Sequence, residues 1–262
     1  MISKADKPYS LFQKVKAYLH FLRLSTNRHG VHSPFVYNFI ENVANYPYSD
    51  KAVEIERKKL TNDHSPITIK DFGMGEDRRS SLSKIAKKSL KKPKEAGLIA
   101  RIVEYYNVRR VIELGSSLGI TTAYIARSAS SVKVKTIEGS EDILTIGRKI
   151  WKQLNLENID SYNGEFDSIL PKLFPLENEK FLFFIDGNHH FSSTLNYFNM
   201  IKKECNKESI FIFDDIHWSE GMEKAWDTIK NDREVSLSID LFELGIVFIN
   251  PRLKKEHFNI RY

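Results

Sequence analysis

Residues 111–122 read VIELGSSLGITT, a run of β-branched and apolar residues that stops at Gly115 and resumes after Gly119 with a helical pattern. A buried strand that passes through a glycine turn directly into a helix is typical of parallel β-α-β units. In open sheets built from such units, ligands bind at the carboxyl ends of the strands. The turn after this strand is therefore a candidate binding loop.

Short apolar runs alternate with helical patterns along the rest of the chain. Seven strands are predicted, at 109–114, 132–138, 159–163, 181–186, 209–215, 235–242 and 245–250. Five helices are predicted between or beside them, at 119–129, 140–154, 166–174, 192–204 and 219–231. Strands that are apolar on both faces predict a mostly parallel sheet with helices on both faces. Because no helix separates the last two runs, we expect them to form a hairpin with one antiparallel strand.

The chain has a different character before about residue 95. Helical spacing predicts a first helix with one apolar face, formed by Leu11, Val15, Leu19 and Leu22. A second helix follows Ser33, a charged third one covers SDKAVEIERKKL, and ITIKDFG is a short strand, whereas DFGMGEDRR is interpreted as an ordinary turn. We therefore predict a helical N-terminal extension at 1–94, covering the substrate or pairing two subunits, and an α/β domain at 95–262.

Composition limits the classes of protein that remain. The chain has 262 residues, 41% of them apolar, which is enough for a large core. It shows neither a run long and apolar enough to span a membrane nor a secretory leader, so we expect a cytoplasmic protein without a membrane partner. Cys205 has no second cysteine to pair with. A net charge of +6 is too small for a dedicated nucleic-acid binder, so nucleic acid is not the expected partner.

Two glutamates narrow the expected ligand. A dinucleotide fingerprint needs G-x-G-x-x-G, whereas this loop has G-x-x-x-G. Glu113, just before the loop, would repel a pyrophosphate but suits a cationic amine or sulfonium. Glu138 ends the next strand, where acidic side chains accept hydrogen bonds from ribose hydroxyls. The pattern predicts a positively charged nucleoside.

The chain resembles the class I S-adenosylmethionine-dependent methyltransferases over about residues 95–250. The resemblance rests on VIELGSSLGITTAYIA, TIEGS and YNGEFDSILPKL. It implies S-adenosylmethionine as cofactor, with the first loop along its methionine part, Glu138 on the ribose and the loop after the third strand beside the adenine. The implied cofactor residues are Glu113, Gly115, Ser116, Ser117, Gly119, Glu138, Gly139, Gly164, Glu165 and Asp186.

Carboxylates also end the fourth and fifth predicted strands, in FIDGNHHF and FIFDDIHWSEGM. Asp186, Asp214 and Asp215 would repel one another strongly unless a hard cation such as Mg²⁺ bound them. Both segments resemble the metal-dependent O-methyltransferases of the catechol and caffeoyl-coenzyme A type. That resemblance implies a site for Mg²⁺ or another divalent cation on these three residues, with Asp186 also catalytic.

The resembling family often carries a lysine three residues after the fourth-strand aspartate, where this chain has His189. We interpret His189 as the catalytic base, a role that suits histidine near neutral pH. Alternatively, His189 and His190 only cap the following helix. His217 is expected as a further polar wall of the pocket.

Together these observations predict a seven-stranded, mostly parallel, Rossmann-like α/β methyltransferase sheet with helices on both faces, a C-terminal antiparallel hairpin strand and the N-terminal extension. The expected function is methyl transfer from S-adenosylmethionine to an oxygen of a small-molecule acceptor, with metal assistance and a possible homodimer. One alternative is an RNA or protein methyltransferase that docks through the lysines of 84–94, although no N-P-P-Y tetrapeptide follows the fourth strand. Another is a non-catalytic nucleoside-binding protein.

Overall fold

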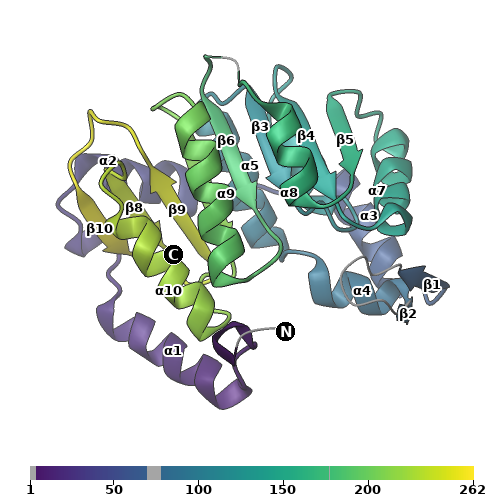
Figure 1. Ribbon diagram of the computed structural model, residues 1–262, viewed down its shortest axis with the longest axis horizontal. Helices are drawn as coiled ribbons and strands as arrows, with labels where there is room; N and C mark the ends of the chain where they lie inside the picture. Colours follow the sequence, from purple (N-terminus) through teal and green to yellow (C-terminus); the bar gives the residue numbers. More distant parts are fainter. Residues whose placement is uncertain (1–3, 70–77, 177) are drawn as a thin grey trace. The chain divides into compact units, whose positions relative to one another are not determined.

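The computed structural model describes residues 4–69, 78–176 and 178–262. The chain forms two compact units, one made of Met1–Asn45 with Pro175–Tyr262 and the other of Tyr46–Phe174 (Figure 1). The predicted extension 1–94 is thus divided between the two units. Most of the predicted turn DFGMGEDRR and the end of the predicted strand ITIKDFG lie outside the described residues.

Three parallel strands form the centre of the 46–174 unit, in the order β3-β4-β5. They are β3 (Arg110–Leu114), β4 (Lys133–Glu138) and β5 (Ile159–Asn163). Val111 pairs with Val134, and Val134 in turn with Ile159, so the three carboxyl ends lie at one edge. Val111, Ile112 and Leu114 are buried, as expected for a strand covered on both faces.

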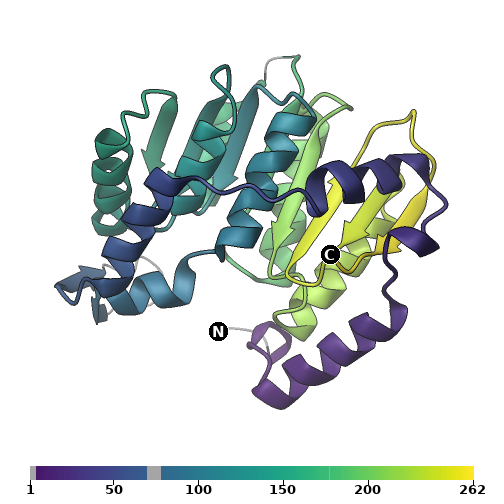
Figure 2. The ribbon, with the colours of Figure 1, turned by 180° about the vertical axis from the view of Figure 1, so that it is seen from behind.

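Helices follow each of these strands as predicted. They are α6 (Ile120–Arg127), α7 (Glu141–Gln153) and α8 (Phe166–Ile169), the last continued by a 3-10 turn, Leu170–Leu173. An additional helix, α5 (Pro93–Tyr105), was not predicted and packs against α6. Figure 1 shows α8 in front of the strands and Figure 2 shows α5 in front, so these helices cover opposite faces.

The remaining elements of this unit precede α5. They are α3 (Lys51–Asn62), β1 (Pro66–Ile69), β2 (Arg78–Ser81) and α4 (Leu82–Ser89). The strands β1 and β2 pair antiparallel, and α3 packs on α4 and α6. Asp50 caps α3 by accepting hydrogen bonds from the amides of Ala52 and Val53, which explains why the charged segment is helical.

The other unit contains five strands in the order β10-β8-β9-β7-β6. Their bounds are β6 (Phe181–Ile185), β7 (Ile210–Asp214), β8 (Leu237–Asp240), β9 (Leu244–Phe248) and β10 (Glu256–Asn259). The predicted hairpin is confirmed, because β9 runs antiparallel to both β8 and β7. The predicted count of seven strands is wrong by one, since β10 pairs parallel with β8. Its side chains are mostly half-buried, so its sequence has no apolar run to indicate a strand.

The helices α9 (Phe191–Glu204) and α10 (Glu220–Asn231), both predicted from the sequence, lie on one face of these five strands (Figure 1). The other face is covered by α2 (Pro34–Phe39), which continues into a π-helical turn, Ile40–Ala44 (Figures 1 and 2). A 3-10 turn, Lys4–Asp6, contacts α10, and α1 (Leu11–Leu24) follows it. Stacked rings fill the core of this unit, with Phe211 between Phe183 and Phe213.

Candidate active site

The loop after β3 adopts a backbone conformation that only a few residues tolerate. Gly115, Ser117 and Gly119 all have positive φ, at 99°, 47° and 79°. A Cβ on Gly119 would lie 2.6 Å from Nε1 of Trp151, which donates a hydrogen bond to the carbonyl of Gly119. The second glycine is therefore required both by its left-handed backbone and by the close approach of α7.

Glu138 connects this loop to the end of the neighbouring strand. One oxygen, Oε2, accepts from the amide of Ser117 at 2.9 Å, and Oε1 accepts from the amide of Ser140 at 3.0 Å. A carboxylate has about four lone-pair positions, and the backbone of Gly139 also interacts with this one, so only part of its acceptor capacity remains for other donors. Burial raises the pKa of Glu138, and the backbone amides partly offset that rise. Glu138 is thus a partly satisfied acceptor at the carboxyl edge of the strands.

Glu113 is fully buried beneath the same loop. Its Oε2 accepts hydrogen bonds from the hydroxyls of Thr122 at 2.5 Å and Thr136 at 2.6 Å. Its Oε1 has no hydrogen-bond partner within the described part of the chain. Burial raises the pKa of Glu113 to about 7, against the opposing effect of the two threonine hydroxyls. A buried carboxylate oxygen without a donor is costly, and a cationic ligand would satisfy it.

The loop after β5 supplies the last of the predicted cofactor residues. Gly164 has a φ of 145° and donates its amide to the carbonyl of Glu138, while Glu165 begins α8. Asn163 was not among the residues predicted from the sequence. Its side-chain amide donates hydrogen bonds to the carbonyls of Glu138 and Gly139 at 3.0 and 3.1 Å. A Cβ on Gly139 would meet no atom within 4 Å. The ends of β4 and β5 are thereby held together beside open space.

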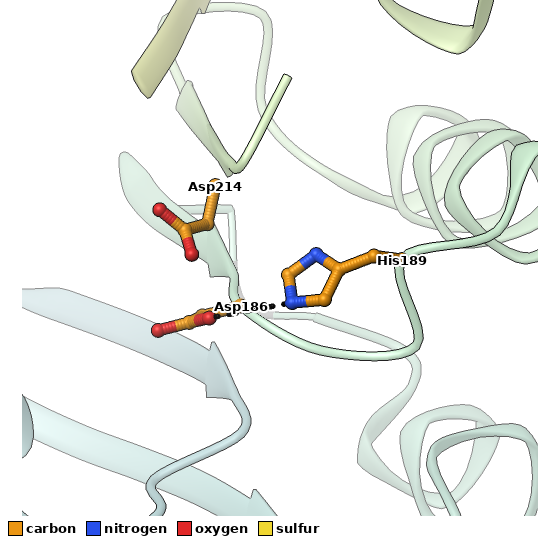
Figure 3. A group of neighbouring side chains, drawn as sticks. All are labelled: Asp186, His189 and Asp214. Atoms are coloured by element: carbon orange, nitrogen blue, oxygen red, sulfur yellow. Dashed lines mark ion pairs between the residues drawn. The ribbon is translucent and has the colours of Figure 1, made fainter. Parts of the chain in front are cut away.

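A second group of candidate residues lies in the other unit, at the ends of β6 and β7. Asp186, His189 and Asp214 each offer one ligand atom, and these atoms lie within 4.8 Å of one another (Figure 3). Nε2 of His189 is 3.9 Å from Oδ1 of Asp186 and 3.8 Å from Oδ2 of Asp215. Figure 3 shows His189 directed toward Asp186 from the loop before α9. Two carboxylates and an imidazole form a donor set that divalent cations bind.

Asp215, the third predicted metal ligand, is at the edge of this group. Its φ is 54°, an uncommon value for a residue with a side chain, and its amide donates to the carbonyl of Glu243. Asn188, on the other loop, also has a positive φ of 51°. Asp and Asn adopt this left-handed conformation more readily than most residues with a side chain.

Two further histidines named in the sequence analysis, His190 and His217, lie outside this group. His190 begins α9 without a side-chain capping bond, and its Nδ1 is 3.6 Å from Asp6. Asp6 instead accepts from the amide of Phe191 and so caps that helix, a role that no local pattern in the sequence indicates.

Both ring nitrogens of His217 are engaged, with Glu223 at 3.0 Å and Asp240 at 2.9 Å. Burial lowers the pKa of His217, but hydrogen bonds to these two carboxylates raise it to about 9. The expected polar wall is thus an ion-paired anchor within its unit.

A separate cavity of about 620 Å³ lies at the amino ends of β4 and β5. Its lining includes Arg127, Lys133 and Asn158 and none of the predicted site residues. Ligands of open α/β sheets bind at the opposite, carboxyl ends of the strands, so we do not assign the cofactor to this cavity.

Residues 112–216 match a family model described as a methyltransferase domain. No curated protein matches the chain. Among solved structures, the O-methyltransferase TomG from Streptomyces achromogenes, involved in tomaymycin synthesis, is 14% identical with a TM-score of 0.58, covering 82% of this chain and 95% of that one. An O-methyltransferase from Bacillus cereus is 17% identical with a TM-score of 0.58, covering 87% and 99%. A putative caffeoyl-CoA O-methyltransferase from Staphylococcus aureus is 12% identical with a TM-score of 0.59, covering 91% and 99%.

At these low identities the structural likeness establishes the fold. It is the Rossmann-like fold of the class I methyltransferases, and the predicted resemblance to that class is confirmed. The match over 112–216, less than half of the chain, adds that this segment is similar to a methyltransferase domain.

Proposed function

We propose that this protein is an S-adenosylmethionine-dependent O-methyltransferase that acts on a small molecule with the assistance of a divalent cation. The observation that carries the proposal is the pair of glutamates under the glycine loop of a methyltransferase domain. Glu138 retains acceptor capacity beyond its bonds to backbone amides, and Glu113 offers one buried acceptor oxygen. A nucleoside with a cationic amine supplies the donors that these two side chains lack.

Each residue has a proposed role in holding the cofactor. Glu138 binds the ribose hydroxyls, and Glu113 binds the ammonium group of the methionine part. The turn at Gly115, Ser116, Ser117 and Gly119 lies along the methionine part, while Gly139, Gly164 and Glu165 flank the nucleoside. Asp186 stays a proposed contact to the cofactor as well as a proposed catalytic residue.

Methyl transfer from a sulfonium forms a bond from carbon to the acceptor oxygen as the bond from carbon to sulfur breaks. Such a displacement needs alignment of the two reactants and an oxygen that has lost its proton. Asp186, His189 and Asp214 would hold the cation, with Asp215 beside them. A divalent cation there would lower the pKa of an acceptor hydroxyl and orient it.

His189 has two proposed roles that an experiment can separate. As a base, it accepts the proton of the acceptor hydroxyl, and His189→Asn lowers turnover without changing metal affinity. As a ligand, its loss weakens metal binding instead.

The first test is calorimetry with S-adenosylhomocysteine, the demethylated product. We expect measurable binding that Glu138→Ala abolishes and that Glu157→Ala, an exposed carboxylate in the same unit, leaves unchanged. No binding by the wild-type protein at millimolar concentration would overturn the proposal.

The second test measures turnover with a panel of phenols and catechols, in Mg²⁺ and after chelation. Turnover that survives chelation would refute the proposed role of a divalent cation. Cofactor binding without turnover on any acceptor would favour a non-catalytic binding protein.

The comparisons support the same class of reaction. The three neighbours described above are O-methyltransferases by name, and the Bacillus cereus structure contains S-adenosylhomocysteine. A small-molecule acceptor, a cytoplasmic location and a homodimer remain part of the proposal.

A further inference from the structure

The helix α1 exposes large apolar side chains. Leu11 and Phe12 are 80% and 79% exposed, and Leu19 is 60% exposed. Val15 and Tyr18, between them, are about half exposed. Leu11, Val15 and Leu19 belong to the apolar face predicted from the sequence, whereas Leu22 of that face is only partly exposed. Tyr18 contacts the ring of Phe242 edge-on, with 4.9 Å between the ring centroids. The other side chains of the stripe remain largely exposed. A contiguous exposed apolar face indicates a site of interaction.

The helix is attached to its unit mainly through its inner side. Its inner side carries Phe21, which is buried and packs 5.4 Å from the ring of Phe242. The segment before it is held where the hydroxyl of Tyr9 donates to Glu223 at 2.7 Å. At its start, Ser10 and Gln13 form a capping box. A stable, anchored helix therefore leaves most of its apolar face exposed. Figures 1 and 2 show α1 at the edge of its unit.

The apolar side chains form one stripe along the helix. At about 100° per residue, Leu11, Phe12, Val15, Tyr18 and Leu19 fall within an arc of about 120°. On the same projection, Lys14 lies at one border of the stripe, and Lys16 and Arg23 lie at the other. Within the described residues, none of these three cations forms an ion pair with a carboxylate.

The segment that contains α1 has lysines and arginines but no aspartate or glutamate. No aspartate or glutamate occurs from Lys7 to Ile40, a segment that holds Lys7, Lys14, Lys16, Arg23 and Arg28. An apolar stripe bordered by Lys and Arg is the pattern of helices that lie in the interface of an anionic bilayer. The fourteen residues of α1 span about 21 Å. No described helix has the length and apolarity needed to traverse a bilayer, so α1 would lie parallel to the surface.

We propose that α1 is an interfacial helix through which this protein binds the surface of membranes that contain anionic lipids. A second copy of the chain is the competing occupant. In a symmetric pairing of α1 with α1, the cations bordering one stripe would meet those of the other, with no acid on the helix to compensate them. Anionic head groups complement the same charges. The proposal departs from the expectation of a protein without a membrane partner.

Flotation with vesicles tests the proposal on the full chain. We expect binding to vesicles of phosphatidylcholine with one quarter phosphatidylglycerol, and at least about tenfold weaker binding to phosphatidylcholine alone. The double variant Leu11→Ser/Phe12→Ser should bind the anionic vesicles at least about tenfold less than wild type. Ile55→Ser, which removes a comparably exposed side chain from α3, should bind as wild type does.

Variants that reverse the charge of basic residues on α1 provide a second test of membrane binding. Lys14→Glu/Lys16→Glu should weaken vesicle binding by about 20-fold or more, whereas Lys58→Glu on α3 should change it little. All these side chains are exposed, so unchanged melting temperatures verify that the variants fold.

The outcomes against the proposal are equally definite. Failure of the wild-type protein to float with anionic vesicles at low salt would overturn it. So would equal binding to neutral vesicles, or a wild-type dimer that Leu11→Ser/Phe12→Ser converts to a monomer without any vesicle binding.

Discussion

Replacing Glu113 by glutamine should change how the stability of the cofactor-free protein depends on pH. The carboxyl is fully buried, and burial raises its pKa from an ordinary 4.5 to about 7. The folded protein therefore keeps the proton over a range in which the unfolded chain has lost it. Stability from this group is complete below about pH 4.5 and is lost as the pH rises to about 7.

The size of this effect follows from the two pKa values. A rise from 4.5 to about 7 corresponds to roughly 3 kcal/mol once both states are ionised. Between about pH 5 and pH 8, the wild-type protein should lose roughly 2.5 kcal/mol that Glu113→Gln does not lose. The amide of the glutamine adds a cost of about 1–3 kcal/mol where Oε1 lacks a partner. That cost is independent of pH, so the change with pH is the diagnostic quantity.

Urea unfolding followed by circular dichroism, at four pH values from 5 to 8, measures this quantity directly. Glu157→Gln, an exposed carboxylate of the same unit, is the matched control and should follow the wild-type protein. If the difference in unfolding free energy between Glu113→Gln and wild type is the same at all four values, Glu113 does not titrate near 7 and the reasoning fails.

The same variant tests the contact with the cofactor's amine. At pH 8, Glu113→Gln should bind S-adenosylhomocysteine about 10- to 100-fold more weakly, because a charge-assisted hydrogen bond is lost. Methylthioadenosine retains the nucleoside but has no amine, and its affinity should be equal in both proteins. Equal losses for the two ligands would mean that the substitution distorts the loop and that no amine contact exists.

Three further substitutions test other contacts. Gly119→Ala places a Cβ 2.6 Å from Trp151 and should lower stability by about 2–4 kcal/mol in urea titrations, whereas Gly139→Ala meets open space and should be close to neutral. Asp214→Asn should abolish the rise in melting temperature that a divalent cation produces while S-adenosylhomocysteine still binds; loss of both responses would make the residue structural. Asp6→Ala removes the cap from α9 and should lower stability by about 1 kcal/mol at neutral pH, and an unchanged midpoint would show that the cap contributes nothing.

The central strands were predictable because their sequences carry the signal locally. The segment VIEL is apolar, β-branched and ended by a glycine, and it forms β3 with only a small difference in bounds. The extra strand Glu256–Asn259 lacks such a signal, because its side chains are only partly buried. The helix at Pro93–Tyr105 was missed even though Pro93 marks its first turn, since the change of character near residue 95 was interpreted as a boundary.

Some features of the candidate site were likewise predictable from the sequence, and others were not. Positions of Glu113, Glu138 and Asp214 follow from where strands end, which the period of apolar residues indicates. The partners of those side chains do not follow, because they depend on packing between segments distant in sequence. Thr122 and Thr136 meet at Glu113 from a helix and a neighbouring strand, and Asp6 reaches α9 across 185 positions of the chain.

The hydrogen bonds that Glu138 accepts also affect how tightly a nucleoside can bind. Its two hydrogen bonds, to the amides of Ser117 and Ser140, already hold the turn before any nucleoside arrives. Preorganisation of this kind removes the entropic cost of ordering a loop from the free energy of association. Affinity should consequently depend on the rigidity of this loop as much as on the contacts made to the nucleoside.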